Sequence, residues 1–293
     1  MKKKVLLSLL LVFVLLFLTS CSFLDTQDKF WQDHLKEFLA RDVCTLLFLD
    51  VGQGDCILIK TPENRFVLVD SGPNTAESTI LKVFNILDIK TFDLVVATHP
   101  HEDHIGNMDK IISEFNVKKF YTVEKTANTQ AFENMLKALD KKNLKISIVR
   151  AYDRISINNV LFTFLSPLKE YENLNDSSAV LKLEFANKKV LLTADISKNV
   201  EYDMLSANED VSADILKVSH HGSYAATSNE FLEKVHPQLA IISVGKDNPY
   251  GHPHKSTLNR LYDHHIKVLT TMDNGNIAVI ISPDGNVKVL TEK

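Results

Sequence analysis

The feature that most constrains this chain is a cluster of three histidines and an aspartate within six residues, His99-Pro100-His101-Glu102-Asp103-His104. The cluster follows Leu94–Ala97, an apolar segment with the length and composition of a buried strand. The next helix is predicted to begin near Asn107, so we expect the cluster to form a short loop at the carboxyl end of the strand. Open α/β sheets bind their ligands at this end.

The spacing within this cluster predicts a metal site with two positions. His99 and His101 alternate along the chain, so both imidazoles can bind one cation. Asp103 and His104 follow directly and can turn toward a second cation a few ångströms away. Asp103 is also the candidate to orient a nucleophilic water between the two positions.

Two later segments supply further candidate ligands. Asp195 follows an apolar strand predicted at 190–193, where an unpartnered buried carboxylate would be unfavourable. As a bridge between two cations it is satisfied; a purely structural role is the alternative. His220 and His221 follow a strand predicted at 215–218, where one could bind metal while the other lines the site. We place His220 as the ligand and His221 in the lining, although the spacing does not decide between them; a structural role for the pair is the alternative. Nitrogen and oxygen ligands without a thiolate suit one or two divalent ions, such as zinc or manganese.

The amino terminus has the pattern of an export signal. Lys2, Lys3 and Lys4 precede an apolar run at 5–18, which at about 1.5 Å per residue is shorter than the ~30 Å core of a bilayer. Residues 1–20 are therefore predicted to be a signal peptide, and Leu18-Thr19-Ser20-Cys21 resembles a bacterial lipoprotein cleavage box. The resemblance implies lipidation of Cys21 and anchoring at the outer face of the cytoplasmic membrane, or at the outer membrane. An uncleaved anchor helix and a plain secretory signal are the alternatives.

The rest of the chain is predicted to hold a tether and one domain. Residues 21–42 are polar with a short amphipathic helix, and residues 43–293 alternate short strands and helices without a linker, which favours a single mixed α/β domain. The formal charge of the whole chain is −4, and residues 1–20 contain lysines but no acidic residue. The mature protein therefore lacks a broadly basic surface, so any nucleic-acid binding must depend on a local site.

Four motifs together resemble a known family. Thr98-His99-Pro100-His101-Glu102-Asp103-His104-Ile105-Gly106 is similar to the metal-binding signature of the metallo-β-lactamase superfamily. Three others resemble the C-terminal domain of ComEC competence proteins: Asp50-Val51-Gly52-Gln53-Gly54-Asp55, Leu216-Lys217-Val218-Ser219-His220-His221-Gly222-Ser223 and Tyr250-Gly251-His252-Pro253-His254. The resemblance covers about 45–293. It implies a four-layer αββα sandwich with the metals at one end, and an Asp70 that supports the loop without binding metal.

The chain departs from the family at one ligand. Many members have another histidine between the first cluster and the bridging aspartate, but no histidine occurs from Ile105 to Ala194. Asn175-Asp176-Ser177-Ser178 occupies the corresponding place, so we expect Asn175 near the site. We also expect the first metal to be weakly held or absent.

The resemblance implies a metal-dependent hydrolase that attacks its substrate with a metal-activated hydroxide. His252 is the candidate to protonate the leaving group or to hold the substrate; a surface histidine is the alternative. His254, in the same loop, is a further candidate for substrate contact. Lys217 and Ser223 are candidates to hold a phosphate, although Lys217 is equally compatible with an outward-facing strand position.

The leading hypothesis is a phosphodiesterase or nuclease acting on DNA, or on a related phosphate ester, outside the membrane. Its partners would then include proteins of a DNA-uptake system. A small-molecule hydrolase of lactams, lactones or thioesters on the same fold is the alternative, as is a metal-stabilised binding protein without turnover. The acidic composition counts mildly against a nuclease that grips long DNA.

Overall fold

The computed structural model of the chain describes residue 34 and residues 37–293. The predicted signal peptide and most of the predicted tether therefore lie outside the described residues. Within the described part, strands and helices extend from Cys44 to Thr291. No helix in this part is both long enough and apolar enough to cross a bilayer.

One large sheet contains eight strands in the order β17-β16-β1-β2-β3-β5-β7-β8. Strands β16, β1, β2 and β3 pair antiparallel, whereas β3, β5, β7 and β8 are parallel. The bounds are β17 (Val287–Thr291), β16 (Ile277–Ile281), β1 (Cys44–Phe48), β2 (Ile57–Thr61), β3 (Arg65–Val69), β5 (Leu94–Ala97), β7 (Phe120–Thr122) and β8 (Ile146–Ile148).

A second sheet contains seven strands in the order β15-β14-β13-β12-β11-β10-β9. Strands β12 to β15 are parallel, and β9 to β12 pair antiparallel. The bounds are β15 (Lys267–Thr270), β14 (Leu239–Ile242), β13 (Ile215–Lys217), β12 (Lys188–Leu192), β11 (Val180–Phe185), β10 (Val160–Ser166) and β9 (Arg154–Ile157).

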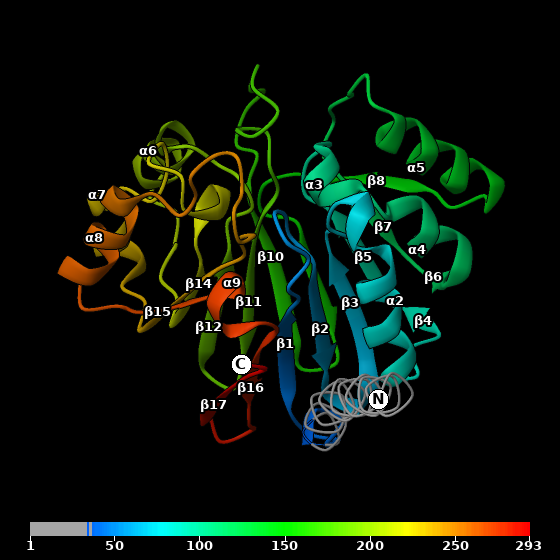
Figure 1. Ribbon diagram of the computed structural model, residues 1–293, viewed down its shortest axis with the longest axis horizontal. Helices are drawn as coiled ribbons and strands as arrows, with labels where there is room; N and C mark the ends of the chain where they lie inside the picture. Colours follow the sequence, from blue (N-terminus) through cyan, green and yellow to red (C-terminus); the bar gives the residue numbers. More distant parts are fainter. Residues whose placement is uncertain (1–33, 35–36) are drawn as a thin grey trace, which may run out of the picture.

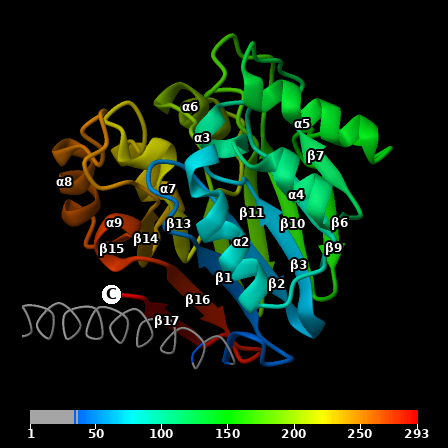
Figure 2. The ribbon, with the colours of Figure 1, turned by 45° about the vertical axis from the view of Figure 1, so that its right-hand side comes forward.

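Helices cover the outer faces of both sheets, as Figures 1 and 2 show. The first sheet is covered by α2 (Glu77–Ile86), α4 (Met108–Glu114) and α5 (Gln130–Lys141), and the second by α6 (Lys198–Ser206), α7 (Asn229–Val235) and α8 (Lys255–Asp263). The smaller elements are η1 (Pro62–Asn64), η2 (Asn74–Ala76), β4 (Thr91–Phe92), α3 (Glu102–Ile105), β6 (Asn116–Val117), η3 (Ser219–Gly222) and α9 (Thr271–Asn274).

Three apolar cores separate the four layers. Strand β1 illustrates the arrangement, because its successive side chains point to opposite faces of the sheet. Leu47 packs in the core beneath the helices, whereas Leu46 and Phe48 pack in the core between the two sheets. A third core lies between the second sheet and its helices. Strands covered on both faces must be apolar nearly throughout, which explains the short continuous runs in the sequence. The predicted αββα sandwich is confirmed.

The parallel strands of both sheets end at the same edge of the sandwich. Asp70 follows β3 and His99 lies two residues beyond β5, while Asp195 and Ser219 follow β12 and β13. The two aspartates that end apolar strands are thereby brought to one place, with His104 between them. The topology alone thus gathers the chemically active side chains at one end.

Candidate metal centre

The histidine cluster is divided by a short helix. The backbone N–H groups of His104 and Ile105 both donate to the His101 carbonyl, which starts the four-residue helix α3 inside the cluster. We expected a loop up to Asn107; the structure instead turns Asp103 and His104 onto this helix, away from His99 and His101. The four side chains therefore serve two neighbouring positions.

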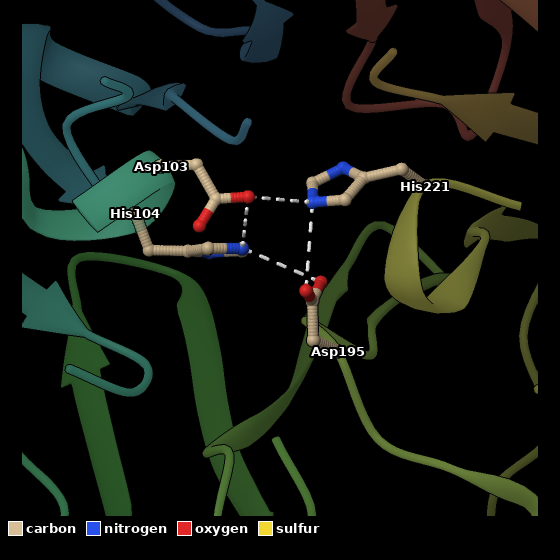
Figure 3. Close-up of side chains that lie close together, drawn as sticks. All are labelled: Asp103, His104, Asp195 and His221. Atoms are coloured by element: carbon tan, nitrogen blue, oxygen red, sulfur yellow. Dashed lines mark ion pairs between the residues drawn. The ribbon is translucent and has the colours of Figure 1, made fainter. Parts of the chain in front are cut away.

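One group of side chains contains two carboxylates and two imidazoles: Asp103, His104, Asp195 and His221 (Figure 3). His104 Nε2 lies 3.4 Å from Asp195 Oδ1, and His221 Nε2 lies 3.5 Å from Asp195 Oδ2. Asp103 Oδ2 is 3.3 Å from His221 Nε2 and 4.0 Å from His104 Nε2. We call this group the carboxylate-rich half of the centre.

The other group is built mainly from imidazoles: His99, His101 and His220, which share Asp195 with the first group. His99 Nε2 lies 3.1 Å from His101 Nδ1 and 4.0 Å from Asp195 Oδ2. His220 Nε2 lies 3.9 Å from the same carboxylate oxygen, and the Asn175 amide nitrogen is 3.4 Å from His220 Nε2. We call this group the histidine-rich half.

The two imidazoles of the carboxylate-rich half are oriented by hydrogen bonds from their Nδ1 atoms. His104 Nδ1 donates to Asp70 at 2.7 Å, and His221 Nδ1 donates to the Ser243 carbonyl at 2.9 Å. These bonds leave both Nε2 atoms facing Asp195. Asp70 also accepts from the backbone N–H and the hydroxyl of Thr98, as expected of a residue that supports the loop.

A buried ion pair lies beneath the centre. The Lys217 ammonium is fully buried, 2.5 Å from Asp55 Oδ2, 3.3 Å from the Ala194 carbonyl and 4.0 Å from Asp195 Oδ1. Asp55 in turn lies 3.7 Å from His221 Nδ1, so the pair packs directly against a candidate ligand. Because both charges are removed from water, loss of either one would leave the other buried and uncompensated.

The two halves shift the pKa values of their histidines in opposite directions. Burial opposes a charge on His221 and His104, but Asp195 and Asp103 outweigh it. They raise the pKa of His221 to about 9 and hold that of His104 well above its ordinary value. In the histidine-rich half, burial and neighbouring imidazoles lower the pKa values of His99 and His220. Burial by itself would raise the pKa of Asp195, but His221 and His104 lower it well below the ordinary range.

The carboxylate-rich half fits a divalent ion. His104 Nε2, His221 Nε2 and Asp195 Oδ1 are buried yet make no hydrogen bond of normal geometry. Ligand atoms bound to one tetrahedral ion at about 2.0–2.2 Å lie roughly 3.3–3.6 Å apart, close to the distances given above. A cation at their midpoint would partner all of them, so the divalent metal expected from the sequence fits these residues.

Close backbone contact fixes the motif loop. Gly54 has φ +138°, and a Cβ added there would lie 2.2 Å from the Asp103 carbonyl oxygen. Asp55 N–H donates to the same oxygen at 3.1 Å. Only glycine permits this approach. The loop between β1 and β2 is therefore packed against the metal centre and helps to hold Asp103 in place.

The centre opens into a hollow of about 680 Å³. Of the predicted site residues, His101, Asp103, Asn175, Asp195, His220, His221 and His252 line it. His252 is half-buried, with its ring 5.6 Å from that of His220. His254 lies next along this loop, 4.9 Å from His252 ring to ring, and its Nδ1 accepts from the Tyr224 N–H.

Three details of the sequence interpretation are corrected. His221, which we expected only to line the site, lies among the four side chains of the carboxylate-rich half, while His220 stays a candidate ligand in the histidine-rich half; both have positive φ in a tight turn. Lys217 neither faces outward nor can contact a phosphate, since Asp55 holds it in the interior. Ser223 is buried, and its hydroxyl accepts from the Ala225 N–H instead of lining the hollow.

The sequence interpretation missed several residues of the site. Asp55 was part of a recognised motif, but its pairing with Lys217 joins segments 162 residues apart and leaves no local pattern. Gln53 and Tyr250 line the hollow. Asn248 makes four hydrogen bonds within its own loop. In the sequence, the position of Asn248 between Gly245 and Pro249 is the one local sign of a turn that its side chain could stabilise.

Comparisons with known proteins agree with this geometry. ComE operon protein 3 of Bacillus subtilis is 32% identical over 247 residues, which cover 78% of this chain and 32% of that protein. Competence protein ComA of Neisseria gonorrhoeae is 29% identical over 226 residues, 76% of this chain and 30% of that protein. The chain thus spans about a third of the length of these relatives.

A solved structure supports the fold. The metallo-β-lactamase fold protein YhfI from Bacillus subtilis superposes with a TM-score of 0.53 at 12% identity, over 84% of this chain and 99% of that one. A family model of the metallo-β-lactamase superfamily matches residues 49–246, which include both halves of the centre. The chain therefore belongs to the metallo-β-lactamase superfamily, and it has the fold of its metal-dependent hydrolases together with candidate ligands for a divalent metal.

Proposed function

We propose that this protein is a metal-dependent phosphodiesterase that hydrolyses DNA or a related phosphate ester. The observation that carries the proposal is the position of Asp195 between the two halves. Its Oδ1 faces His104, and its Oδ2 faces His221 of the carboxylate-rich half as well as His99 and His220 of the histidine-rich half. A carboxylate in this position could hold two divalent cations side by side, and two such cations would stabilise the attacking and the leaving oxygen of a phosphate ester. Similarity to competence proteins, which act in DNA uptake, supports DNA as the substrate.

Each residue has a role that follows from its position. A divalent ion, zinc or manganese, would supply Lewis acidity and lower the pKa of a bound water. Asp103 lines the hollow at the carboxylate-rich half, where it can orient a water. His252 faces His220 across the hollow, where it can donate a proton to the departing oxygen or hold the substrate.

The surroundings of His252 keep its ring neutral until a substrate binds. Burial, together with the neighbouring His221, lowers its pKa to about 4. The ring is therefore neutral at physiological pH, so it must first receive a proton before it can give one to a leaving oxygen. A substrate phosphate beside the ring would stabilise the protonated form and return the pKa toward its ordinary value.

Cellular location is part of the proposal. Lys2, Lys3, Lys4 and the segment ending in Cys21 support export and lipid anchoring at the outer face of a membrane. There the protein would meet external DNA together with partner proteins of an uptake system. Globomycin treatment of expressing cells tests this, since it should cause the unprocessed precursor to accumulate; unchanged mobility would contradict a lipoprotein.

Activity can be tested on three substrates side by side. Purified protein is analysed for bound metal, then incubated with end-labelled DNA, a chromogenic β-lactam and an acyl thioester. We expect DNA cleavage that EDTA stops and that manganese or zinc restores. His101→Ala should abolish it, whereas His264→Ala, at the end of α8, should not. Cleavage of the lactam or thioester alone would establish the small-molecule alternative, and tight binding without product would establish a binding protein.

A further inference from the structure

Four aromatic rings form a continuous strip that begins at the metal centre. Tyr250 stacks on His252 with ring centroids 5.6 Å apart and planes 27° from parallel. His252 contacts His254 at 4.9 Å, and His254 contacts Tyr224 at 5.0 Å. His252, inside the strip, lies 5.6 Å from the ring of His220 and so joins the strip to the metal centre. We call Tyr250, His252, His254 and Tyr224 the aromatic strip.

The two tyrosines of the strip are directed to solvent. Tyr224 and Tyr250 are each 62% exposed. One exposed tyrosine needs no explanation, but two that are joined through a pair of histidines to the edge of a metal centre form a surface. Their ring faces are available to a ligand that presents flat aromatic groups at a short distance from its reacting bond.

The backbone holds the strip in place. Asn248 donates to the carbonyls of Gly245 and His252 and accepts from the N–H groups of Tyr250 and His252. At the other end, His254 N–H donates to the Gly222 carbonyl, and the Tyr224 N–H donates to His254 Nδ1. The rings are thus positioned before any ligand arrives, which reduces the entropy lost on binding.

The charges around the strip indicate that stacking, more than ion pairing, would provide affinity. Among the described residues that line the hollow there is neither lysine nor arginine. Exposed Lys246 and Lys255 stand at the two ends of the segment that carries Tyr250, His252 and His254. Two cations suffice for occasional phosphate contacts but form no continuous basic track.

We propose that the aromatic strip binds the unpaired bases of single-stranded DNA next to the phosphate that lies in the metal centre. Bases stack on aromatic side chains with little regard to sequence, because every base has a π-face. In a duplex those faces are covered by neighbouring base pairs, so the strip selects single strands. The inference rests on the proposed function and narrows its substrate class.

Binding can be measured apart from hydrolysis. In EDTA, which prevents metal-dependent turnover, fluorescence anisotropy compares three probes: an oligothymidylate of about 20 nucleotides, an abasic strand with the same phosphates, and a duplex. We expect the oligothymidylate to bind on the order of tenfold more tightly than either of the others. Equal binding of the abasic strand, or equal binding of the duplex, would overturn the inference.

Variants locate the binding surface. Tyr250→Ala and Tyr224→Ala should each weaken oligothymidylate binding by on the order of tenfold and leave abasic binding unchanged, whereas Tyr250→Phe should keep the affinity. Tyr262→Ala, which removes an exposed tyrosine of α8, is the matched control. Affinity that is unchanged in both strip variants would refute the proposal.

The outcome also separates this inference from the proposed function. With metal restored, Tyr250→Ala should raise KM for single-stranded DNA and leave kcat nearly unchanged. Hydrolysis with an unaltered KM would refute base binding by the aromatic strip and leave the phosphodiesterase proposal standing. Base-dependent binding without any hydrolysis would support the aromatic strip as a binding surface and refute the phosphodiesterase proposal.

Discussion

The two halves of the metal centre use the same residue types in opposite electrostatic surroundings. In the carboxylate-rich half, Asp103 and Asp195 face two imidazoles and raise the pKa of His221 to about 9. In the histidine-rich half, Asp195 is the one carboxylate of the described residues within 4.0 Å of His99 and His220, and burial lowers the pKa of His99 well below its ordinary value. The difference shows that the number of carboxylates, more than the number of histidines, determines where positive charge is stable.

The halves also differ in how their ligands are supported. Asp70 and the Ser243 carbonyl each bind a ring of the carboxylate-rich half directly. His99 reaches Asp70 only through the Thr98 hydroxyl, and His220 has a 3.4 Å contact with Asn175, where the family resemblance implied a further histidine. We therefore expect one tightly bound ion in the carboxylate-rich half and a weaker one beside it.

The largest effect is expected where the halves meet. Asp195→Asn removes the charge shared by both positions while keeping the shape of the side chain. Bound metal should fall at both positions, and activity should drop by more than the roughly 100-fold typical of losing an outer partner. Metal analysis together with DNA cleavage measures both.

Asp88→Asn, on the exposed surface beside Lys90, is the matched control and should behave as wild type. If Asp195→Asn retained one full equivalent of metal, the carboxylate would serve a single half, and the view of Asp195 as a bridge would be wrong.

The next largest effect concerns stability beneath the carboxylate-rich half. Lys217→Met leaves Asp55 buried without its cation, which is expected to destabilise the fold by about 3–5 kcal/mol. The double variant Asp55→Asn/Lys217→Met removes both charges and should recover most of that loss. Urea denaturation of the metal-free proteins measures the free energy of unfolding of each variant. A double variant no more stable than Lys217→Met would show that the two charges do not stabilise each other.

The sequence predicted the centre where its pattern is local. The histidine cluster follows a recognisable strand, and Asp70 and Asp195 each end one, so the parallel topology had to bring them to a single edge. The short apolar strands that alternate with helices predicted a mixed α/β domain, whereas the four αββα layers were implied by the resemblance to the metallo-β-lactamase superfamily. The mixed α/β pattern and the single edge depend only on periodicity and on where strands end.

Other features depend on contacts between distant segments. Lys217 lies on β13, in the middle of a sheet covered on both faces, so no outward position exists there; a three-residue strand gives no period from which to infer this. His220 and His221 have φ of 50° and 53°, and this turn decides which ring meets Asp103. Neither the turn nor the partner is encoded in local spacing.

The raised pKa of His221 predicts how pH acts on the metal-free protein. A histidine with a pKa of about 9 in the folded state and an ordinary value when unfolded stabilises the fold below about pH 6.5. That stabilisation is lost as pH rises through about 9, because the folded state then releases the extra proton. Melting temperatures in EDTA should fall over this range. His221→Gln should reduce the fall without abolishing it, because the pKa of His104 is also raised. Bound metal should abolish the fall by replacing the proton.

The smallest effect compares the supports of the two halves. Asp70 has φ +61°, a conformation that asparagine also tolerates, so Asp70→Asn tests the carboxylate without disturbing the backbone. An amide cannot accept from both Thr98 and His104 as the carboxylate does, so metal affinity should fall roughly 10- to 100-fold. Asn175→Ala removes only the contact to His220, and its effect on the weaker ion should stay below about tenfold. Calorimetric titration with manganese or zinc resolves both affinities. If Asn175→Ala cost more affinity than Asp70→Asn, the histidine-rich half would be the tighter position, because its support would then contribute more than a buried carboxylate.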